Sequence, residues 1–254
     1  MGMNCSISKN KRTSECKTRP KPILPYWGGK AKVADKIISK FPEHRTYVET
    51  FAGGGSVYWA NNIPDNFVIN DLDKDIYHLY KTAKNSPDSI KKCDFNGMTK
   101  GKFNRIKEKN NKSSCDIINL HKHSFGGSPT NGFAEKHKNF HNRFNEEHTK
   151  KLNKTRVMNE NFEKIAKEYD KEEVLQYWDP PYVKGGNAYK THGVSPEQVC
   201  KVAKDLKKAK VVISYDINAD VKKACKGLKF SHIKLPYLAG NNKHIKTEYL
   251  IKNF

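Results

Sequence analysis

Short apolar runs of strand length alternate with helix-like segments along this chain, and this order constrains the fold more than any other feature of the sequence. The expected strands cover 47–50, 67–71, 174–178, 211–215, 229–235 and 248–252, and the expected helices cover 31–40, 57–60, 75–84, 195–207 and 219–226. The almost continuously apolar run at 211–215 is typical of a buried parallel strand. This alternation predicts an α/β fold with a mostly parallel sheet, helices on both faces, and ligands bound beyond the carboxyl ends of the strands.

The alternation is interrupted once, between about 91 and 165. In this stretch Lys, Asn and His dominate, apolar periodicity is weak, and the run Gly126-Gly127-Ser128-Pro129 breaks any long element. We therefore expect three parts in the chain. These are a disordered basic arm at 1–20, an α/β domain formed by 21–90 and 166–254, and a small, mainly helical insert at 91–165.

The charge balance and the cysteines narrow the class of protein. The chain carries 48 Lys and Arg against 27 Asp and Glu, a formal net charge of +21. Such an excess is typical of proteins that bind polyanions, although a Lys-rich, solvated surface gives the same balance. The six cysteines, at 5, 16, 93, 115, 200 and 225, form no C-x-x-C pair, so we expect free thiols in a reducing compartment. No apolar run has the length of a membrane span.

A glycine loop follows the first expected strand, with the sequence Phe51-Ala52-Gly53-Gly54-Gly55-Ser56. Glycines at this place let the backbone turn tightly and approach a ligand closely. Asp71 ends the next strand, where its carboxylate can accept both hydrogen bonds of a ribose diol. The glycine spacing differs from G-x-x-x-x-G-K-[ST], which argues against an ATPase loop. The pattern predicts a nucleotide-like ligand.

The sharpest signal is Asp179-Pro180-Pro181-Tyr182, directly after the expected strand at 174–178. Proline has no backbone N–H, so this turn presents a carboxylate and carbonyl oxygens without competing donors. These acceptors suit an amino group on a planar ring. Asp179 and the Pro180 carbonyl accept its hydrogens and localise the nitrogen lone pair, which the ring otherwise delocalises. Tyr182 can stack on the base, which has to be flipped out of a duplex first.

Together these motifs resemble the Dam-type family (D12 class, alpha group) of DNA adenine-N6 methyltransferases. Four motifs occur in the order of that family: Tyr26-Trp27-Gly28-Gly29-Lys30, the loop 51–56, Asn70-Asp71 and Asp179-Pro180-Pro181-Tyr182. They fall within 24–85 and 174–253, so the resemblance covers well over half of the chain.

The resemblance implies a Rossmann-like methyltransferase domain that transfers a methyl group from S-adenosylmethionine to N6 of adenine in double-stranded DNA. The cofactor-binding residues it implies are Tyr26, Trp27, Lys30, Phe51, Gly53, Gly55, Ser56, Asp71 and Asp179. The catalytic residues it implies are Asp179, Pro180, Pro181 and Tyr182.

Three alternatives share parts of this pattern. The same catalytic motif serves adenine in RNA, and the amino group of cytosine offers the same chemistry. Asp rather than Ser at 179 favours adenine over cytosine. A catalytically idle DNA-binding relative is the third alternative, against which the intact Asp179 and glycine loop argue.

The insert departs from the members of the family that read GATC. The run 121–128, His-Lys-His-Ser-Phe-Gly-Gly-Ser, stands where those members carry an Arg-x-Asn segment and a glycine-containing run. Arg and Asn suit base edges and Lys suits phosphates. We expect DNA contacts from Asn131, Asn142, Arg143, Lys154 and Arg156, and from Asn242 and Lys243 in the loop before the last strand. The histidines at 121, 123, 137, 141 and 148 lack the acidic partner of a zinc site, so we expect no metal.

Double-stranded DNA is therefore the expected partner. We expect no membrane association and no obligate protein partner, and a cognate restriction endonuclease is compatible with this activity. The expected location is the cytoplasm, or the DNA-containing compartment of an infected host.

Overall fold

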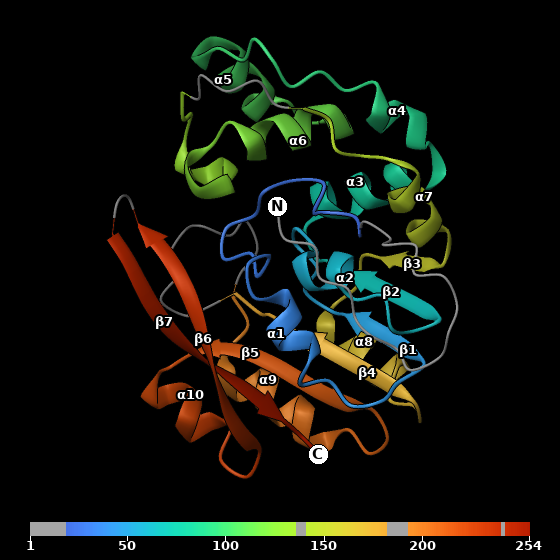
Figure 1. Ribbon diagram of the computed structural model, residues 1–254, viewed down its shortest axis with the longest axis vertical. Helices are drawn as coiled ribbons and strands as arrows, with labels where there is room; N and C mark the ends of the chain where they lie inside the picture. Colours follow the sequence, from blue (N-terminus) through green and yellow to red (C-terminus); the bar gives the residue numbers. More distant parts are fainter. Residues whose placement is uncertain (1–18, 136–140, 182–192, 240–241) are drawn as a thin grey trace, which may run out of the picture.

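The computed structural model describes residues 19–135, 141–181, 193–239 and 242–254 (Figure 1). A seven-stranded sheet with the order β3-β2-β1-β4-β5-β7-β6 forms the centre of the molecule. Its strands are β1 Thr46–Glu49, β2 Asn66–Asn70, β3 Thr155–Met158, β4 Val174–Trp178, β5 Lys210–Asp216, β6 Lys229–Ala239 and β7 Asn242–Lys252. The first five strands pair in parallel, and β7 pairs antiparallel with β5 and β6.

The helices form two layers, one on each face of the sheet. Their bounds are α1 Ala34–Ile38, α2 Ser56–Ala60, α3 Lys74–Asn85, α4 Pro87–Lys91, α5 Lys100–Glu108, α6 Ser114–Lys122, α7 Glu146–Asn153, α8 Phe162–Glu168, α9 Pro196–Asp205 and α10 Ala219–Ala224, with 3-10 turns η1 Phe125–Gly127 and η2 Pro129–Asn131. One buried cluster joins α1, α2, α3 and α6 to side chains such as Tyr47 and Tyr177. A second cluster joins α8, α9 and α10 to Trp178 and Tyr215 on the opposite face. The expected α/β fold with a mostly parallel sheet is confirmed.

The order in which the chain adds strands to the sheet reverses between β1 and β4, which are adjacent and parallel. From β1 the chain builds outward through β2 to β3, and from β4 it builds the other way through β5. In parallel sheets such a reversal opens a crevice at the carboxyl ends of the two central strands. Every motif that the sequence singled out for cofactor or catalysis, apart from 26–30, lies at the carboxyl end of β1, β2 or β4.

The expected end of the insert is wrong, because β3 belongs to the sheet. Thr155–Met158 pairs in parallel with Phe67–Asn70 of β2, and α8 packs on the sheet through Phe162 and Ala166. Residues 155–165 are therefore part of the α/β domain. β3 is a short edge strand, and its sequence, Thr-Arg-Val-Met, gave no alternating apolar signal.

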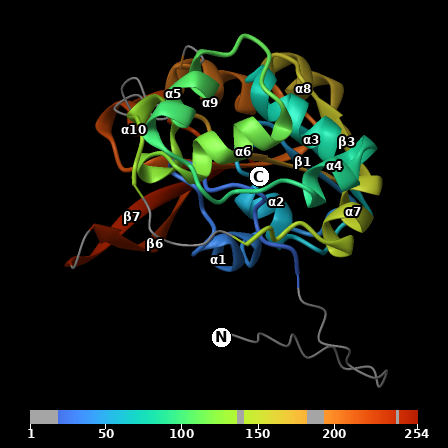
Figure 2. The same cartoon turned by 90° about the horizontal axis from the view of Figure 1, so that it is seen from above.

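The rest of the insert that the structure describes consists of α5, α6, the two 3-10 turns and α7. In Figure 1, α5 and α6 lie at the top, far from α9 and α10. The view rotated by 90° shows α6 beside α3 (Figure 2), and the two helices are in contact. A buried lysine ties α7 to the domain: Lys151 Nζ donates to the carbonyl oxygen of Asn61 and, at 3.1 Å, to Asn62 Oδ1. Lys151 thereby caps the carboxyl end of α2, and its ammonium is committed to the fold.

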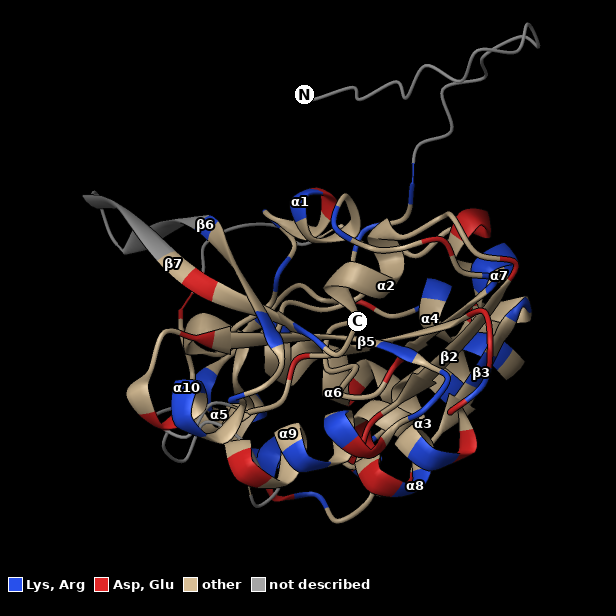
Figure 3. Cartoon of the chain, turned by 90° about the horizontal axis from the view of Figure 1, so that it is seen from below, with Lys and Arg blue, Asp and Glu red and all other residues tan. Residues whose placement is uncertain are grey.

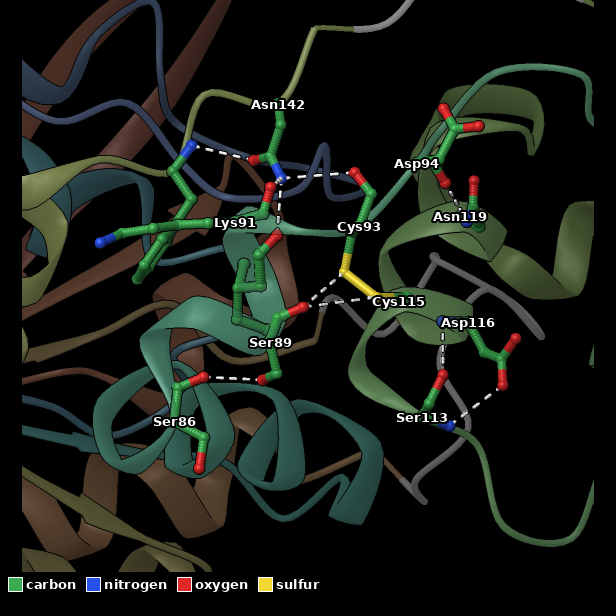
Figure 4. The surroundings of a disulfide bond; sticks show 12 residues. Ser86, Ser89, Lys91, Cys93, Asp94, Ser113, Cys115, Asp116, Asn119 and Asn142 are labelled. Atoms are coloured by element: carbon green, nitrogen blue, oxygen red, sulfur yellow. Dashed lines mark hydrogen bonds between the residues drawn. A yellow bond between two sulfur atoms is a disulfide. The ribbon is translucent and has the colours of Figure 1, made fainter.

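Two disulfides correct the prediction of free thiols. Cys93 bonds to Cys115 across a Cα–Cα distance of 5.4 Å, and Cys200 bonds to Cys225 across 5.1 Å. The first bond joins the segment after α4 to the first turn of α6 (Figure 4). Each pair is separated by more than twenty positions in the sequence, so only the fold brings the sulfurs together.

The same region commits Asn142, which we expected to read bases. Its amide nitrogen donates to the carbonyl oxygens of Ile90 at 2.6 Å and Lys91 at 3.1 Å (Figure 4). Its Oδ1 accepts the backbone N–H of Phe144 at 3.0 Å. Asn142 is a structural residue that holds two segments of the insert together, because all of these partners are backbone groups of the chain itself.

At the carboxyl end of the expected basic arm, residues 19 and 20 contact the body of the protein. Residues 1–18 lie outside the described residues, but Arg19 forms an ion pair with Asp35 of α1, and Pro20 is buried. Lysine positions also occur on α1, α7, α9 and α10, and each of these helices carries at least one acidic position as well (Figure 3). None of the helices that the structure describes combines the length and hydropathy that crossing a bilayer requires.

The disulfide in the insert yields a stability prediction. Closing a loop of 22 residues stabilises a fold by about 3 kcal/mol in the chain-entropy model. We expect Cys93→Ser to lower the Tm of the oxidised protein by several degrees, measured by calorimetry without reductant. When both proteins are measured with a reducing agent, the Tm of the parent should come close to the Tm of Cys93→Ser. An unchanged Tm in the oxidised variant contradicts the stabilising role of this bond.

Candidate active site

The loops after β1, β2 and β4 meet at one edge of the sheet, because these strands are parallel and adjacent. The glycine loop 51–55 follows β1, Asp71 follows β2, and Asp179 follows β4. The sequence placed these three motifs at strand ends, and the structure brings them to neighbouring positions.

Two glycines of the loop adopt backbone angles that other residues avoid. Gly53 has φ +46° and Gly55 has φ +63°. A Cβ on Gly53 would lie 2.7 Å from Cε1 of Tyr26, and one on Gly55 would lie 2.5 Å from the hydroxyl oxygen of Tyr80. Glycine is therefore required here both by the left-handed turn and by the rings packed against it.

Asp71 braces the glycine loop. Its Oδ2 accepts the backbone N–H of Gly53 at 2.7 Å, and its Oδ1 accepts that of Asp73 at 2.9 Å. Burial raises the pKa of Asp71 to about 6, although these hydrogen bonds oppose the rise. A carboxylate oxygen has more than one lone pair, so Asp71 keeps acceptor capacity for a ribose hydroxyl. Its link to the loop was not anticipated from the sequence.

Tyr26 and Trp27 connect the glycine loop to the insert. The ring of Tyr26 lies against Gly53 and stacks on His121 of α6, with 5.3 Å between ring centroids and 19° between planes. Trp27 is 38% exposed and covers Gly126, where a Cβ would lie 2.2 Å from Cζ3 of its ring. The close packing of Trp27 on the insert was missed, although Gly126-Gly127 is the signal in the sequence that marks it.

Lys30 lies at the centre of the site. Its ammonium donates to both carboxylate oxygens of Asp179, each at 2.9 Å, and to the carbonyl oxygen of Gly28 at 3.0 Å. Glu248 Oε2 lies 3.7 Å from the same nitrogen. The side chains of Lys30 and Glu248 are each 5% exposed, whereas that of Asp179 is 21% exposed. Asp179 is therefore the member of this group that a substrate can reach.

The two carboxylates control the charge of Lys30. Burial lowers the pKa of a lysine, but the attraction of Asp179 and Glu248 outweighs burial and holds the pKa of Lys30 above its ordinary value. Lys30 is thus a permanent cation at neutral pH. Lys30 and Asp179 were predicted from the sequence, but Glu248 was missed, because no local pattern in β7 links a strand residue to a lysine 218 positions away.

Glu49 ends β1 beneath the glycine loop and is 3% exposed. Tyr47 donates its hydroxyl hydrogen to Glu49 Oε2 at 2.5 Å. Burial raises the pKa of Glu49 to about 8, and the nearby Asp179 carboxylate adds to the rise. Glu49 therefore holds its proton at neutral pH and acts as a neutral member of the core.

The remaining residues expected at the cofactor and catalytic site differ in their surroundings. Ser56 begins α2 and is half-buried, while the ring of Phe51 packs on Phe162 with 5.4 Å between centroids. Pro180 is buried and Pro181 half-buried, directly after Asp179. Tyr182 lies outside the described residues.

The residues expected to contact DNA fall into three groups. Asn131 and Arg143 are exposed on the insert, and Asn131 donates to the Phe125 carbonyl oxygen at 3.2 Å. Lys154 and Arg156 lie at the start of β3, which is the opposite end of the sheet from Asp71. Arg156 also forms an ion pair with Glu168 at 2.8 Å.

Asn242 and Lys243 belong to a projecting β-hairpin. They pair with Ala239 and Leu238 near the tip, so they are strand residues and the expected loop before the last strand is shorter. β7 pairs with β5 only from Glu248 onward, and Glu248 lies opposite Asp216 at the carboxyl end of β5. The hairpin therefore extends past the edge of the sheet that carries Asp179, and Figure 1 shows it projecting from the body of the molecule.

Three of the five histidines bind backbone carbonyl oxygens. His121 contacts Gly127 O at 2.8 Å, His123 contacts Phe95 O at 2.9 Å, and His148 contacts Lys21 O at 2.8 Å. These rings serve the packing of the insert. His137 lies outside the described residues.

The family follows from a comparison with known sequences. The family model of the D12 class N6 adenine-specific DNA methyltransferase matches residues 26–239. The chain belongs to this family. Membership in the D12 class confirms the resemblance that the four motifs predicted, and with it N6-adenine methylation of DNA as the family's activity.

Relatives of this D12 class protein carry similar names. The DNA adenine methylase of Haemophilus influenzae is 25% identical over an alignment of 296 positions, which covers 98% of this chain and 98% of the relative. The DNA N-6-adenine-methyltransferase of Escherichia phage P1 is 30% identical over 91 residues, which cover 34% of this chain and 12% of the relative. Among solved structures, precorrin-6y C5,15-methyltransferase of Geobacter metallireducens is 10% identical, covers 87% of this chain and 85% of that chain, and has a TM-score of 0.37.

The residues at the carboxyl edge fit S-adenosylmethionine by their chemistry. Asp71 offers acceptors for a ribose, and Tyr26 offers a half-exposed ring above the glycine turn. Thr50 Oγ1, at the carboxyl end of β1, is buried without a hydrogen-bond partner among the described residues. An unsatisfied buried hydroxyl at this place is consistent with a polar ligand.

Glu49 provides a test of this electrostatic arrangement. Its folded-state pKa of about 8 exceeds the ordinary value of 4.5, so between these pH values the unfolded chain loses a proton that the folded protein keeps. The free energy of unfolding therefore falls by about 1.4 kcal/mol per pH unit across this window. We expect the Tm of cofactor-free Glu49→Gln to exceed that of the parent by an increasing margin from pH 5 to pH 8, measured by calorimetry.

The exposed Glu43 gives a control, because Glu43→Gln removes a solvated carboxylate. Its Tm difference from the parent should stay nearly constant over the same range. A margin for Glu49→Gln that does not grow with pH contradicts the buried, protonated state.

Proposed function

We propose that this D12 class protein methylates the exocyclic amino group of adenine in double-stranded DNA, with Asp179 as the acceptor of the amino hydrogens. The observation that carries this proposal is the position of Asp179. It follows buried β4 at the chain reversal, it is the exposed member of an otherwise buried charge cluster, and two prolines follow it. Such a site accepts hydrogen bonds from a flat amino group, and its two prolines add no backbone N–H that competes.

The chemistry assigned to the chain is local. Asp179 and the Pro180 carbonyl accept the two amino hydrogens, which moves electron density onto the nitrogen lone pair. The nitrogen forms a bond to the methyl carbon as the carbon–sulfur bond breaks, and the surplus proton leaves through Asp179 toward solvent. S-adenosylmethionine supplies the methyl group with a neutral thioether as the leaving group. The protein contributes orientation and the exclusion of water.

The substrate and cofactor are assigned to opposite sides of Asp179. Tyr26, the glycine turn and Asp71 form the cofactor side, as the resemblance implies. The exposed Asn131 and Arg143 of the insert and the hairpin residues Asn242 and Lys243 form the DNA side. A base in a duplex reaches Asp179 only when it is flipped out of the helix, so base flipping is part of the proposal. Lys154 and Arg156 are left out, because they lie at the other end of the sheet.

Asp179→Ala tests the catalytic role. We expect the methylation rate to fall by about 10²–10⁴-fold, because the amino group loses its charged acceptor. The measurement follows transfer of labelled methyl groups from S-adenosylmethionine to unmethylated double-stranded DNA. Nucleoside analysis of the product distinguishes N6-methyladenine from N4-methylcytosine.

A matched control is Asp216→Asn, which changes an acid at the end of the neighbouring strand β5. Its methylation rate should stay near that of the parent. Activity of Asp179→Ala near the parent level overturns the proposed mechanism. Transfer to RNA with none to double-stranded DNA overturns the proposed substrate.

A further inference from the structure

We infer that Glu248 is a positioning residue for Asp179 and acts through the ammonium group of Lys30. The inference rests on the proposed role of Asp179 as acceptor of the amino hydrogens. It concerns the ion pair between Lys30 and Glu248, an acid that comes from the far end of the chain. Lys30 precedes α1, Asp179 follows β4, and Glu248 lies in β7.

The distances show an ammonium that serves two acids unequally. Lys30 Nζ lies 2.9 Å from each oxygen of Asp179 and 3.7 Å from Glu248 Oε2. An amino group that enters the site needs the same Asp179 oxygens that Lys30 occupies. Each such oxygen accepts more than one hydrogen bond, but only if the ammonium stays on one side of the carboxylate. Glu248 lies where it can hold the ammonium on that side.

Burial makes this restraint strong. Lys30 and Glu248 are each 5% exposed, so water screens their attraction little. Among the described residues, this cluster sets one cation between two anions. Without Glu248, the pull of the second acid on the ammonium is lost, and the ammonium follows the Asp179 carboxylate more closely. The oxygens then lose acceptor strength toward the amino hydrogens, and the geometry for attack becomes less well defined.

The fold fixes Glu248 as firmly as a strand allows. Glu248 lies opposite Asp216 in the antiparallel ladder of β5 and β7, and its neighbours Tyr249 and Leu250 are buried. The ladder therefore fixes the backbone from which the Glu248 carboxylate reaches Lys30. Asp179 lies after the end of β4, outside the strand ladder, and Lys30 bonds both of its carboxylate oxygens.

Other titratable groups surround this cluster, and they set the background of any pH profile. They are Tyr47 and Glu49 on β1, Tyr177 on β4 and Tyr215 on β5, and burial raises the pKa of each. Their contribution is common to variants that leave them intact. A difference between two such variants therefore reports on the pair that was changed.

The test compares Glu248→Gln with the parent and with Asp216→Asn, which removes the same charge from the opposite position of the ladder. Labelled-methyl transfer to unmethylated double-stranded DNA gives kcat at saturating S-adenosylmethionine, and calorimetry gives the Kd of the cofactor. We expect kcat of Glu248→Gln to fall by about tenfold or more, with the Kd within about twofold of the parent. Glu248→Asp, which keeps the charge on a shorter side chain, should recover part of kcat.

The pH profile gives a readout that a merely structural residue would not move. Glu248 helps to keep Lys30 protonated, so Glu248→Gln lowers the pKa of Lys30. The alkaline decline of kcat should therefore begin at lower pH in Glu248→Gln than in the parent. Asp216→Asn should keep the parent profile.

Each outcome decides the inference. A folded Glu248→Gln with the kcat and alkaline limb of the parent overturns it, as does a weakened cofactor Kd with unchanged kcat. If Glu248→Gln fails to fold, Glu248→Ala, which also removes the carboxylate, carries the test, and a parent-like kcat and pH profile in that folded variant overturns the inference. Activity in Asp179→Ala overturns the proposed function itself. An inactive Asp179→Ala beside a parent-like Glu248→Gln overturns only the role of Glu248.

Discussion

The parallel pairing of β1 with β4 is the constraint on which the site depends. These two strands come from segments more than a hundred positions apart, and the chain leaves them in opposite directions across the sheet. Their carboxyl ends therefore cannot be covered by the same connection. The glycine loop and Asp179 follow these two carboxyl ends, and Lys30 reaches Asp179 from the segment before α1. The pairing of these two strands thus places the glycine loop next to Asp179.

The second constraint is the balance of buried charge at the carboxyl ends of β1 and β4. Lys30 is cationic because two carboxylates hold it so, whereas Glu49, one strand away, keeps its proton because burial prevails and the Asp179 carboxylate opposes a further negative charge. Lys151 on the insert belongs to the same layer, and burial lowers its pKa to about 7. The site therefore does not tolerate an additional buried anion, and a neutral Glu49 leaves Asp179 and Glu248 as the acids that share Lys30.

Much of this architecture could be predicted from the sequence, because local signals encode it. The apolar run of β5, the glycines at 53 and 55 and the prolines after Asp179 each specify a backbone geometry by themselves. The features that were missed depend on contacts between distant segments. β3 is four residues long at the edge of the sheet, so its identity comes from its partner β2. The disulfides, the bracing of Gly53 by Asp71 and the contact of Glu248 with Lys30 join positions whose proximity no local pattern records.

The two parts of the β6–β7 hairpin tolerate changes in chain length differently. Residues from 242 to 247 pair only with β6 and project beyond the sheet, whereas from Glu248 onward β7 is also locked to β5. Insertions or deletions at the tip change the reach of this arm and leave the face of each residue below it unchanged. The loss of a single residue in the ladder with β5 would turn Glu248 to the opposite face of the sheet, because side chains alternate along a strand. The outer part of the hairpin can therefore change in length and sequence, while the base of the same strand has to keep its register.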